Sequence, residues 1–293
     1  MSGSTFNQNL LDIVVSTSKI KQDIKVSLVT TCFQDLENLK KTALSVLTQN
    51  YPIEWIVIDA DSGPETTIFL GSLESEKHSI IWVSEKDDGI YAGMNKGFLK
   101  SSGDIVLFLN AGDLLATRYI IESVVEDYLT VKWLWSVALA VRVNSDGTPR
   151  SVWEYLSPEL GGLALGTRTF CHQATFYTRD LLNKFMPYDN SNLAADHLLN
   201  IKCFKHAHPR MLTFVSTYFL DGGISSKRPF SASMLDLRRI RKQEDLLLFN
   251  SYILDKIVSV FVILGVRVGG IIWDTLRRTS RKFAGAASRK TFQ

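Results

Sequence analysis

The fold is decided between residues 25 and 64, where the chain reads KVSLVTTCFQDLENLKKTALSVLTQNYPIEWIVIDADSGP. Residues 25–31 are a short β-branched run that ends at polar residues, which is typical of a buried parallel strand. Residues 35–49 carry apolar side chains at helical spacing and precede Pro52, so they predict a helix. A second strand is predicted at 55–58 and runs into turn-forming residues. The order strand, helix, strand predicts an α/β domain.

The same pattern recurs farther along the chain, with a strand predicted at 80–83, a helix at 90–100 and a very apolar strand at 105–109. This alternation predicts parallel strands joined by right-handed crossovers. Ligands of such sheets bind beyond the carboxyl ends of the strands. We therefore expect the polar residues that end these strands to line one rim of the sheet. They are Thr30-Thr31, Asp59-Ala60-Asp61 and Asn110 to Asp113.

The second half of the chain is less regular. Strands are predicted at 133–143 and 174–177, around Gly161-Gly162. We expect a mixed, mostly parallel sheet flanked by helices, with a Rossmann-like nucleotide-binding half and a helical C-terminal appendage. The expected boundaries are an N-terminal extension at 1–24, the main domain at 25–230 and a basic amphipathic appendage at 231–293.

Composition narrows the class of protein. With 293 residues, 45% of them hydrophobic and 22% charged, the chain can bury a full core and is not a disordered protein. A net charge of +3 is too small to indicate a nucleic-acid partner. Cys32, Cys171 and Cys203 match no zinc or disulfide spacing, so we expect buried thiols in a reducing compartment. The N-terminus shows no secretory pattern, and we expect a cytoplasmic protein.

Several carboxylates are candidates for ligand binding, each with a plain structural alternative. Asp113 follows a buried strand and could hold a Mg²⁺ or Mn²⁺ ion that bridges a diphosphate, although the sequence around it is also an ordinary turn. Asp59 and Asp61 could accept hydrogen bonds from a base or a ribose, or form an Asx turn. Asp87 or Asp88 could serve a ligand, or cap the helix that follows.

The later candidate residues also have both a functional and a structural interpretation. His172, beside Gln173, lies where a loop meets a strand, and such a histidine can be structural or functional. Asp196 lies near a predicted helix N-terminus, where it could be a cap or a general base. Residues 221–228, DGGISSKR, suit a loop that closes over phosphates or a surface turn.

Taken in order, these segments resemble the inverting glycosyltransferases of family 2, which have the GT-A fold. Residues 84–113, SEKDDGIYAGMNKGFLKSSGDIVLFLNAGD, are similar to the signature of a bacterial WcaE-like subgroup that builds capsules, O-antigens and colanic acid. CHQATFY (171–177), AADHLL (194–199) and DGGISS (221–226) match its later blocks, so the resemblance covers about 25–226.

The resemblance implies transfer of a sugar from a UDP-, GDP- or dTDP-sugar to a saccharide acceptor that a polyprenyl lipid could carry. Asp196 falls on the family's general base. Asn110 and Asp113 occupy the place of its Asp-x-Asp metal motif, which implies Mn²⁺ or Mg²⁺ at Asp113 to stabilise the departing diphosphate. The residues implied at the donor are Thr30, Thr31, Asp59, Asp87, Asn95, Lys96, Asn110, His172, Gln173, Ser225, Lys227 and Arg228.

The sequence departs from the family pattern at identifiable positions. Asn110 replaces the first acid of the metal pair, and Asp61 stands where the family usually has glycine. His197 stands where a tyrosine is common, and a cationic histidine there would lower the pKa of Asp196. The Gln-x-x-Arg-Trp motif of processive members is absent after residue 226, so we expect one sugar per encounter.

The C-terminal appendage has a different character. Residues 233–250 predict a basic amphipathic helix, and residues 257–273 are nearly all apolar but contain Arg267. A membrane span needs about 20 apolar residues and tolerates a central arginine poorly. The basic residues after Asp274 favour association with anionic lipid at the inner membrane surface, with burial in the fold or in a dimer, or a span, as alternatives.

Two other functions fit the sequence less well. A catalytically silent nucleotide-sugar-binding scaffold would explain Asn110, but Asp196 and the glycine loop argue against it. A dehydrogenase would need a Gly-x-Gly-x-x-Gly motif after the first strand, and none follows. The sequence leaves a homo-oligomer open.

Overall fold

The computed structural model describes residues 24–144, 146–153, 159–166, 168–220, 229–248 and 251–261. The chain divides into two compact units. The first is Met1–Leu163 with Thr167–Lys227, and the second is Ala164–Gly166 with Arg228–Gln293. Each unit is described by itself.

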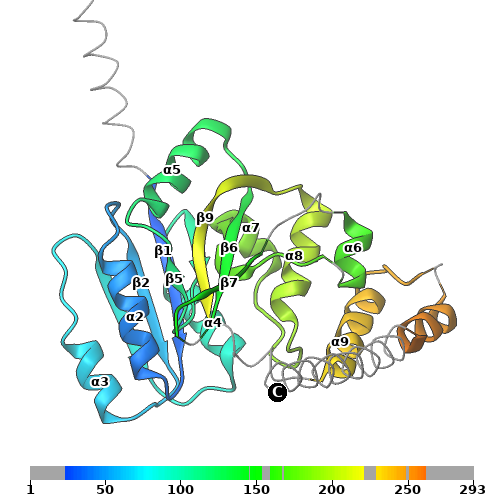
Figure 1. The fold of residues 1–293 in the computed structure, drawn as a ribbon, viewed down its shortest axis with the longest axis horizontal. Coiled ribbons are helices and arrows are strands. Elements are labelled where there is room, and N and C mark those ends of the chain that lie inside the picture. Colours follow the sequence, from blue (N-terminus) through cyan, green and yellow to red (C-terminus); the bar gives the residue numbers. More distant parts are fainter. Residues whose placement is uncertain are drawn as a thin grey trace, which may run out of the picture. The chain divides into compact units, whose positions relative to one another are not determined.

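The first unit is built on a mixed sheet of nine strands in the order β3-β2-β1-β4-β8-β6-β9-β5, with β7 paired to β6 (Figure 1). The strands are β1 (Val26–Cys32), β2 (Glu54–Asp59), β3 (Ser79–Ser84), β4 (Ile105–Phe108), β5 (Leu114–Leu115), β6 (Trp135–Val143), β7 (Pro149–Trp153), β8 (Thr175–Thr178) and β9 (Arg210–Leu220). The mixed α/β architecture is therefore confirmed.

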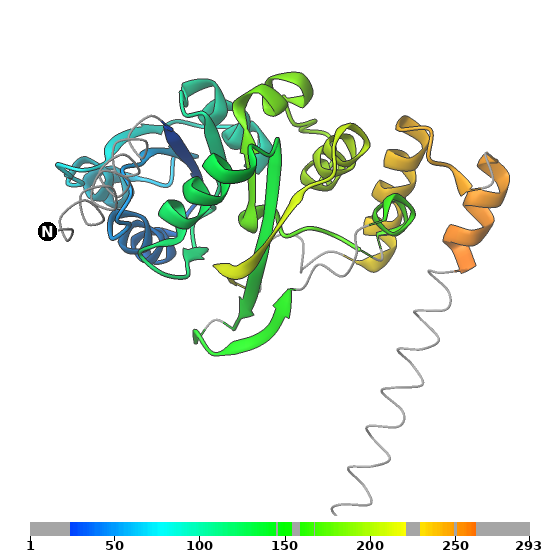
Figure 2. The same cartoon turned by 90° about the horizontal axis from the view of Figure 1, so that it is seen from above.

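Strand direction decides which chain segments meet at one rim. β1, β2, β3 and β4 are parallel, and β1 lies between β2 and β4, which makes the β1–β4 boundary a topological switch point. β8 is antiparallel to β4 and β6. β9 is parallel to β6, and the long arrows of these two strands lie side by side in Figure 2. The carboxyl ends of β1, β4, β6 and β9 therefore share a rim with the amino end of β8.

Helices connect and cover these strands. The predicted helix at 90–100 is present as α4 with the same bounds, whereas α3, α5 and β9 were not predicted. The helices are α2 (Leu36–Leu47), α3 (Pro64–Gly71), α4 (Ile90–Lys100), α5 (Ile120–Val131), α6 (Leu160–Leu165), α7 (Arg179–Phe185) and α8 (Ala195–His206), with a 3-10 turn, η1, at His172–Ala174. α6 ends in the second unit.

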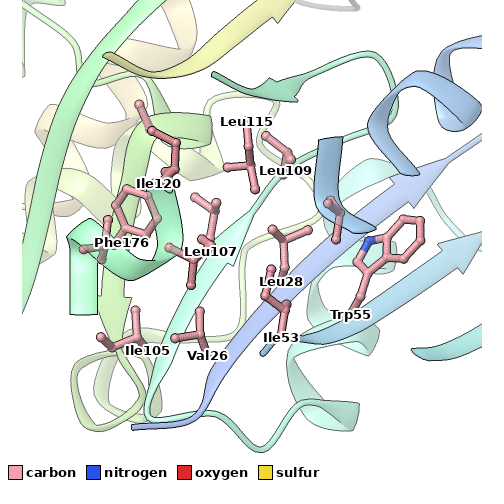
Figure 3. Packing of buried hydrophobic residues seen from close by; sticks show 14 of the residues in the cluster. Val26, Leu28, Ile53, Trp55, Ile105, Leu107, Leu109, Leu115, Ile120 and Phe176 are labelled. Carbon is pink, nitrogen blue, oxygen red and sulfur yellow. The ribbon is translucent and has the colours of Figure 1, made fainter. Parts of the chain in front are cut away.

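The core fills both faces of the sheet. On one face, strand residues such as Leu28, Trp55 and Leu107 form a buried cluster with apolar residues of α2 and α5 (Figure 3). On the other face α4 packs so closely that a Cβ atom on Gly97 would lie 2.3 Å from Cγ1 of Val29. The three cysteines are free and buried, as the sequence predicts.

The second unit contains α9 (Phe230–Gln243) and a helix at 252–261. The predicted helix at 233–250 is too long, because α9 stops at Gln243 and Asp245 adopts a left-handed φ of 55°. The buried carboxylate of Asp255 accepts a 2.7 Å hydrogen bond from Nε of the equally buried Arg241. Residues 262–273 of the predicted apolar segment lie outside the described residues. Within the described part of the chain, no helix has the length and apolar character needed to cross a membrane.

Candidate active site

Several polar side chains lie at the rim beside the switch point. Successive residues of a strand point to opposite faces of the sheet, so neighbouring residues there have different partners. At the end of β1, Thr31 turns toward α4, where a Cβ on Gly93 would lie 3.0 Å from Cγ2 of Thr31 and 3.1 Å from Oδ2 of Asp87. Gly93 therefore lies close to both Thr31 and Asp87. Asp87 also accepts a 3.0 Å hydrogen bond from the Gly89 amide, so it caps the turn before α4 as well.

Asn110, which follows β4, joins β1 to the start of β8. Its Oδ1 accepts a 2.7 Å hydrogen bond from the Thr31 hydroxyl. Its Nδ2 lies 3.3 Å from Nε2 of His172. Both groups of the Asn110 side-chain amide thus face protein partners.

His172 in turn reaches Asp196 in the first turn of α8. Nδ1 of His172 lies 3.3 Å from Oδ2 of Asp196, and the Tyr91 hydroxyl donates a 2.8 Å hydrogen bond to Oδ1 of Asp196. We call the five residues Thr31, Asn110, His172, Asp196 and Tyr91 the hydrogen-bond chain. The Asp196 side chain is 26% exposed, so a substrate hydroxyl could reach it.

Asp196 is an ionised acceptor at neutral pH. Burial raises its pKa, but the hydrogen bonds from His172 and Tyr91 outweigh burial and lower the pKa below its usual value. The helix N-terminus also favours a negative charge at this position. Burial raises the pKa of Tyr91 well above its usual value, so the phenol keeps the proton that it donates.

His197 is the residue at which a cationic ring was predicted to lower the pKa of Asp196. His197 is buried and its Nε2 lies 2.8 Å from the Leu163 carbonyl oxygen. Burial lowers the pKa of His197, which keeps the ring neutral at physiological pH. The low pKa of Asp196 therefore depends mainly on His172 and Tyr91, with a smaller effect from His197.

Asp113 is held in the turn between β4 and β5. Thr42 accepts a 2.9 Å hydrogen bond from the Gly112 amide and donates one of 2.9 Å to the Asp113 carbonyl oxygen. The Asp113 carboxylate accepts a 3.1 Å hydrogen bond from the Leu220 amide at the end of β9. Burial raises the pKa of Asp113 to about 7, so a nearby cation would favour its ionised form.

The residues present fit a metal ion that the substrate largely coordinates. Among the described residues, no group of three or more His, Cys, Asp or Glu side chains could hold a metal. Mg²⁺-type ions, however, are often held by one or two carboxylates while phosphates and water complete the shell. Asp113 suits that mode. Asn110 does not, because its amide is already used within the hydrogen-bond chain.

Three predicted donor residues form hydrogen bonds within the protein. Thr30 is buried on the α2 side of the sheet, where its Oγ1 accepts a 2.9 Å hydrogen bond from Trp55 Nε1. Asp59 lies at the rim, but its buried carboxylate accepts hydrogen bonds from Ser62 and from Ser84, the latter at 2.6 Å. These contacts correspond to the Asx-turn alternative for Asp59.

Asn95 is the third. It accepts a 2.7 Å hydrogen bond from the Tyr188 amide and donates one of 3.0 Å to the Tyr188 carbonyl oxygen. It therefore fixes the loop before α8. The side chain of Lys96 pairs at 2.6 Å with Glu85.

The remaining predictions lie near Asp113 or outside the described residues. Gln173 is buried, and its Oε1 accepts a 3.2 Å contact from Cys171 Sγ. Its side chain also hydrogen-bonds to Asp113, which lowers the pKa of that carboxyl group against the larger effect of burial. Ser225, Lys227 and Arg228 lie outside the described residues.

Sequence reasoning missed Tyr91. The segment around it was singled out for its acids, lysines and glycines, but no role was given to the tyrosine. An available signal was its position, since an aromatic hydroxyl in the first turn of a helix that begins at the rim can reach other side chains of the rim. The contact to Asp196 joins residues 105 positions apart and could not be read from local spacing.

The fold and the site together define an α/β enzyme domain with a candidate acid–base carboxylate at the sheet's switch point. Residues 27–157 match the family described as Glycosyl transferase family 2. An uncharacterised glycosyltransferase of Mycobacterium tuberculosis is 32% identical over 225 residues, which cover 73% of this chain and 82% of that protein. The chain belongs to glycosyl transferase family 2.

Other comparisons agree on the family and the fold. A PGL/p-HBAD biosynthesis glycosyltransferase of Mycobacterium bovis is 29% identical over 188 residues, covering 59% of this chain and 68% of that protein. The crystal structure of S. aureus TarS 1-349 in complex with UDP superposes with a TM-score of 0.58 at 15% identity over 75% of this chain. This chain spans 65% of the length of that TarS chain. The likeness to TarS shows the GT-A fold.

Proposed function

We propose that this chain is an inverting, non-processive glycosyltransferase that moves one hexosyl unit from a nucleoside-diphosphate sugar to a hydroxyl group of a saccharide acceptor. The observation that carries the proposal is the ionised Asp196, held at the N-terminus of α8 by His172 and Tyr91 and still 26% exposed. Family membership supports glycosyl transfer as the reaction. We assign the transfer chemistry to residues 25–230, with 1–24 and 231–293 as extension and appendage.

The proposed reaction is a single displacement. The acceptor oxygen attacks the anomeric carbon while Asp196 takes the proton of the acceptor hydroxyl. The bond from the anomeric carbon to the diphosphate oxygen breaks, and its electron pair leaves with the diphosphate. Asp196 is fully ionised in the free enzyme, and the hydroxyl proton becomes acidic enough to transfer as the new bond forms. Attack from the face opposite the leaving group inverts the configuration.

Thr31, Asp87 and Asp113 are the proposed donor side of the site, because all three lie at the rim where β1 and β4 end. Solved TarS structures contain UDP and UDP-GlcNAc, which supports a nucleotide sugar as the donor class here. A UDP-, GDP- or dTDP-sugar is proposed. A Mn²⁺ or Mg²⁺ ion at Asp113 would supply charge stabilisation for the departing diphosphate.

The proposed acceptor is a polyprenyl-linked saccharide at the inner membrane surface. The exposed Arg239 on α9 and the basic residues after Asp274 support attraction to anionic lipid. The likeness of residues 84–113 to the capsule, O-antigen and colanic-acid subgroup supports a role in cell-surface polysaccharide assembly. Full-length protein should sediment with anionic vesicles. Equal sedimentation of a chain ending at Asn250 would contradict a membrane role for the tail.

The reaction is tested by incubating the full chain with UDP-, GDP- and dTDP-sugars, with and without Mn²⁺ or Mg²⁺, and following nucleoside diphosphate release. Wild type should select one donor, and Asp196→Asn should lower release by about 10²–10⁴-fold, as expected for loss of a general base. Asp180→Asn is the matched control, because Asp180 is an exposed aspartate in the first turn of α7.

The same experiment separates the alternative function. Tight donor binding without release, even when lipid extract is supplied as acceptor, would contradict catalysis. It would favour a catalytically silent nucleotide-sugar-binding scaffold of a polysaccharide assembly complex.

A further inference from the structure

The hydrogen-bond chain has a direction, which follows from the orientation of the Asn110 amide. A Thr31 hydroxyl hydrogen points to Oδ1 of Asn110 at 2.7 Å. The amide nitrogen of Asn110 is then the atom that faces Nε2 of His172 at 3.3 Å. An amide nitrogen only donates, so this contact requires a lone pair on Nε2.

Asp196 determines whether the other ring nitrogen of His172 carries a hydrogen. Nδ1 of His172 lies 3.3 Å from the ionised carboxylate of Asp196, which only accepts. Nδ1 must therefore carry a hydrogen. With a hydrogen on Nδ1 and a lone pair on Nε2, the His172 ring is neutral.

A carboxylate at position 110 would have the reverse effect. It would accept from Nε2, and His172 would then carry hydrogens on both nitrogens between two acids. A cationic ring beside Asp196 would make that carboxylate a poorer proton acceptor. The amide at position 110, where the family motif has an acid, therefore has a physical reason that does not involve a metal.

We propose that Asn110 is a positioning residue that holds His172 as the neutral Nδ1–H tautomer, so that Asp196 is the one group of the dyad able to take the acceptor's proton. The inference rests on the proposed function and deepens it. During transfer the proton passes from the acceptor oxygen to Asp196, and His172 keeps its own. The dyad goes from one negative charge to none, and no second base is needed.

The tautomer is tested directly by long-range ¹H–¹⁵N NMR of histidine-labelled full-length protein. His172→Gln identifies the His172 signals among the five histidines of the chain. The expected spectrum at neutral pH is that of a neutral ring protonated on Nδ1, and Asn110→Asp should convert it to the doubly protonated form. A wild-type ring protonated on Nε2, or on both nitrogens, overturns the proposal.

Kinetics with the donor that wild type selects test whether the tautomer matters. Asn110→Asp should lower kcat by about 10²-fold, near the lower limit of general-base effects, and leave the donor KM within about twofold. Thr31→Val should lower kcat as well, because the amide loses the hydroxyl that orients it, while Thr31→Ser, which keeps the hydroxyl, should lose less kcat than Thr31→Val. Asn50→Asp is the matched control, since Asn50 is exposed and precedes β2, away from the rim.

A double-mutant cycle separates positioning from donor binding. In the His172→Gln background, Asn110→Asp should change kcat by less than about threefold, because its effect passes through the missing ring. An unchanged loss in that background, or an Asn110→Asp enzyme as active as wild type, overturns the proposal. A wild type that releases no diphosphate from any donor would instead contradict the proposed function, and the NMR tautomer would then decide this inference alone.

Discussion

At the scale of single residues, neighbouring positions have different surroundings. Thr30 and Thr31 are adjacent, yet one hydroxyl accepts a hydrogen bond from Trp55 in the core and the other donates to Asn110 at the rim. Asp61 has a φ of 59°, which explains why the family usually has glycine there and why aspartate, which tolerates the left-handed region, is accepted. The role of each polar residue therefore depends on its backbone conformation and on the face of the sheet to which its side chain points, as well as on its residue type.

The buried carboxyl group of Asp113 predicts how the stability of the protein depends on pH, and this can be tested without measuring glycosyl transfer. Its pKa is about 3.8 when unfolded and about 7 when buried, so the folded state holds the proton more tightly and the free energy of unfolding should fall as pH rises between these values. In metal-free buffer, Asp113→Asn should be at least as stable as wild type at pH 8, because it carries no buried charge.

Thermal unfolding of both proteins across this pH range, with and without Mn²⁺, checks the prediction. Mn²⁺ with donor diphosphate should raise the Tm of wild type but not that of Asp113→Asn. Equal stabilisation of the two proteins would contradict the assignment of Asp113 as the metal ligand.

Glu54 should show the opposite pH dependence at the far end of β2. Burial raises its pKa, but hydrogen bonds from Lys25, Ser102 and Ser27 lower it from 4.5 to about 2. The stabilisation is therefore present above about pH 4.5 and lost as pH falls toward 2. Glu54→Gln should lower the free energy of unfolding by roughly 2–3 kcal/mol at pH 7 and by less at pH 3.

Urea denaturation at the two pH values measures this difference. Glu65→Gln, at an exposed position in the first turn of α3, is the control and should cost little. A loss for Glu54→Gln that is the same at pH 3 and pH 7 would show that the carboxylate's charge is not the cause.

At the scale of elements, α4 links packing to the site. Its N-terminal turn carries Tyr91 of the hydrogen-bond chain, and Gly97 allows its close approach to β1. Because α4 packs closely on β1 at Gly97, a shift of the helix at that point would also move Tyr91. The position of Tyr91, which donates a hydrogen bond to Asp196, therefore depends on how α4 packs at Gly97.

Gly97→Ala should be destabilising and should impair the site. The new Cβ would lie 2.3 Å from Cγ1 of Val29, so α4 must shift, at a cost of about 1–3 kcal/mol. Gly71→Ala in α3 is the matched control, because its Cβ would meet its nearest neighbour at an ordinary 3.9 Å. Denaturation and diphosphate release measure both effects. A Gly97→Ala protein as stable and active as Gly71→Ala would contradict the close packing of α4.

At the scale of the whole molecule, local patterns predicted the first half of the sheet well. The strands near 25–31, 55–58, 80–83 and 105–109 and the helix at 90–100 are all present, because each has a clear apolar period and turn residues at its ends. α5 was missed because its sequence, IIESVVEDYLTV, is rich in β-branched residues that favour strands. The predicted helix at 233–250 was too long because basic composition gave no sign of the turn at Asp245.

The candidate site was predicted less completely, for a physical reason. The motifs identified the rim and Asp196, but the partners of a polar side chain come from distant segments. Asn95 bonds to Tyr188, 93 residues away, and Asp59 finds partners in Ser62 and Ser84. Local spacing cannot distinguish a carboxylate or amide that faces a ligand from one that the protein itself satisfies.

The central claim is that one carboxylate, Asp196, activates an acceptor hydroxyl for a single displacement at the anomeric carbon. The most direct measurement is the anomeric configuration of the new glycosidic bond, read by NMR from product made with a donor of known configuration. The account predicts a configuration inverted relative to the donor. A product that retains the donor's configuration would contradict it, because retention requires a different mechanism from one displacement assisted by Asp196.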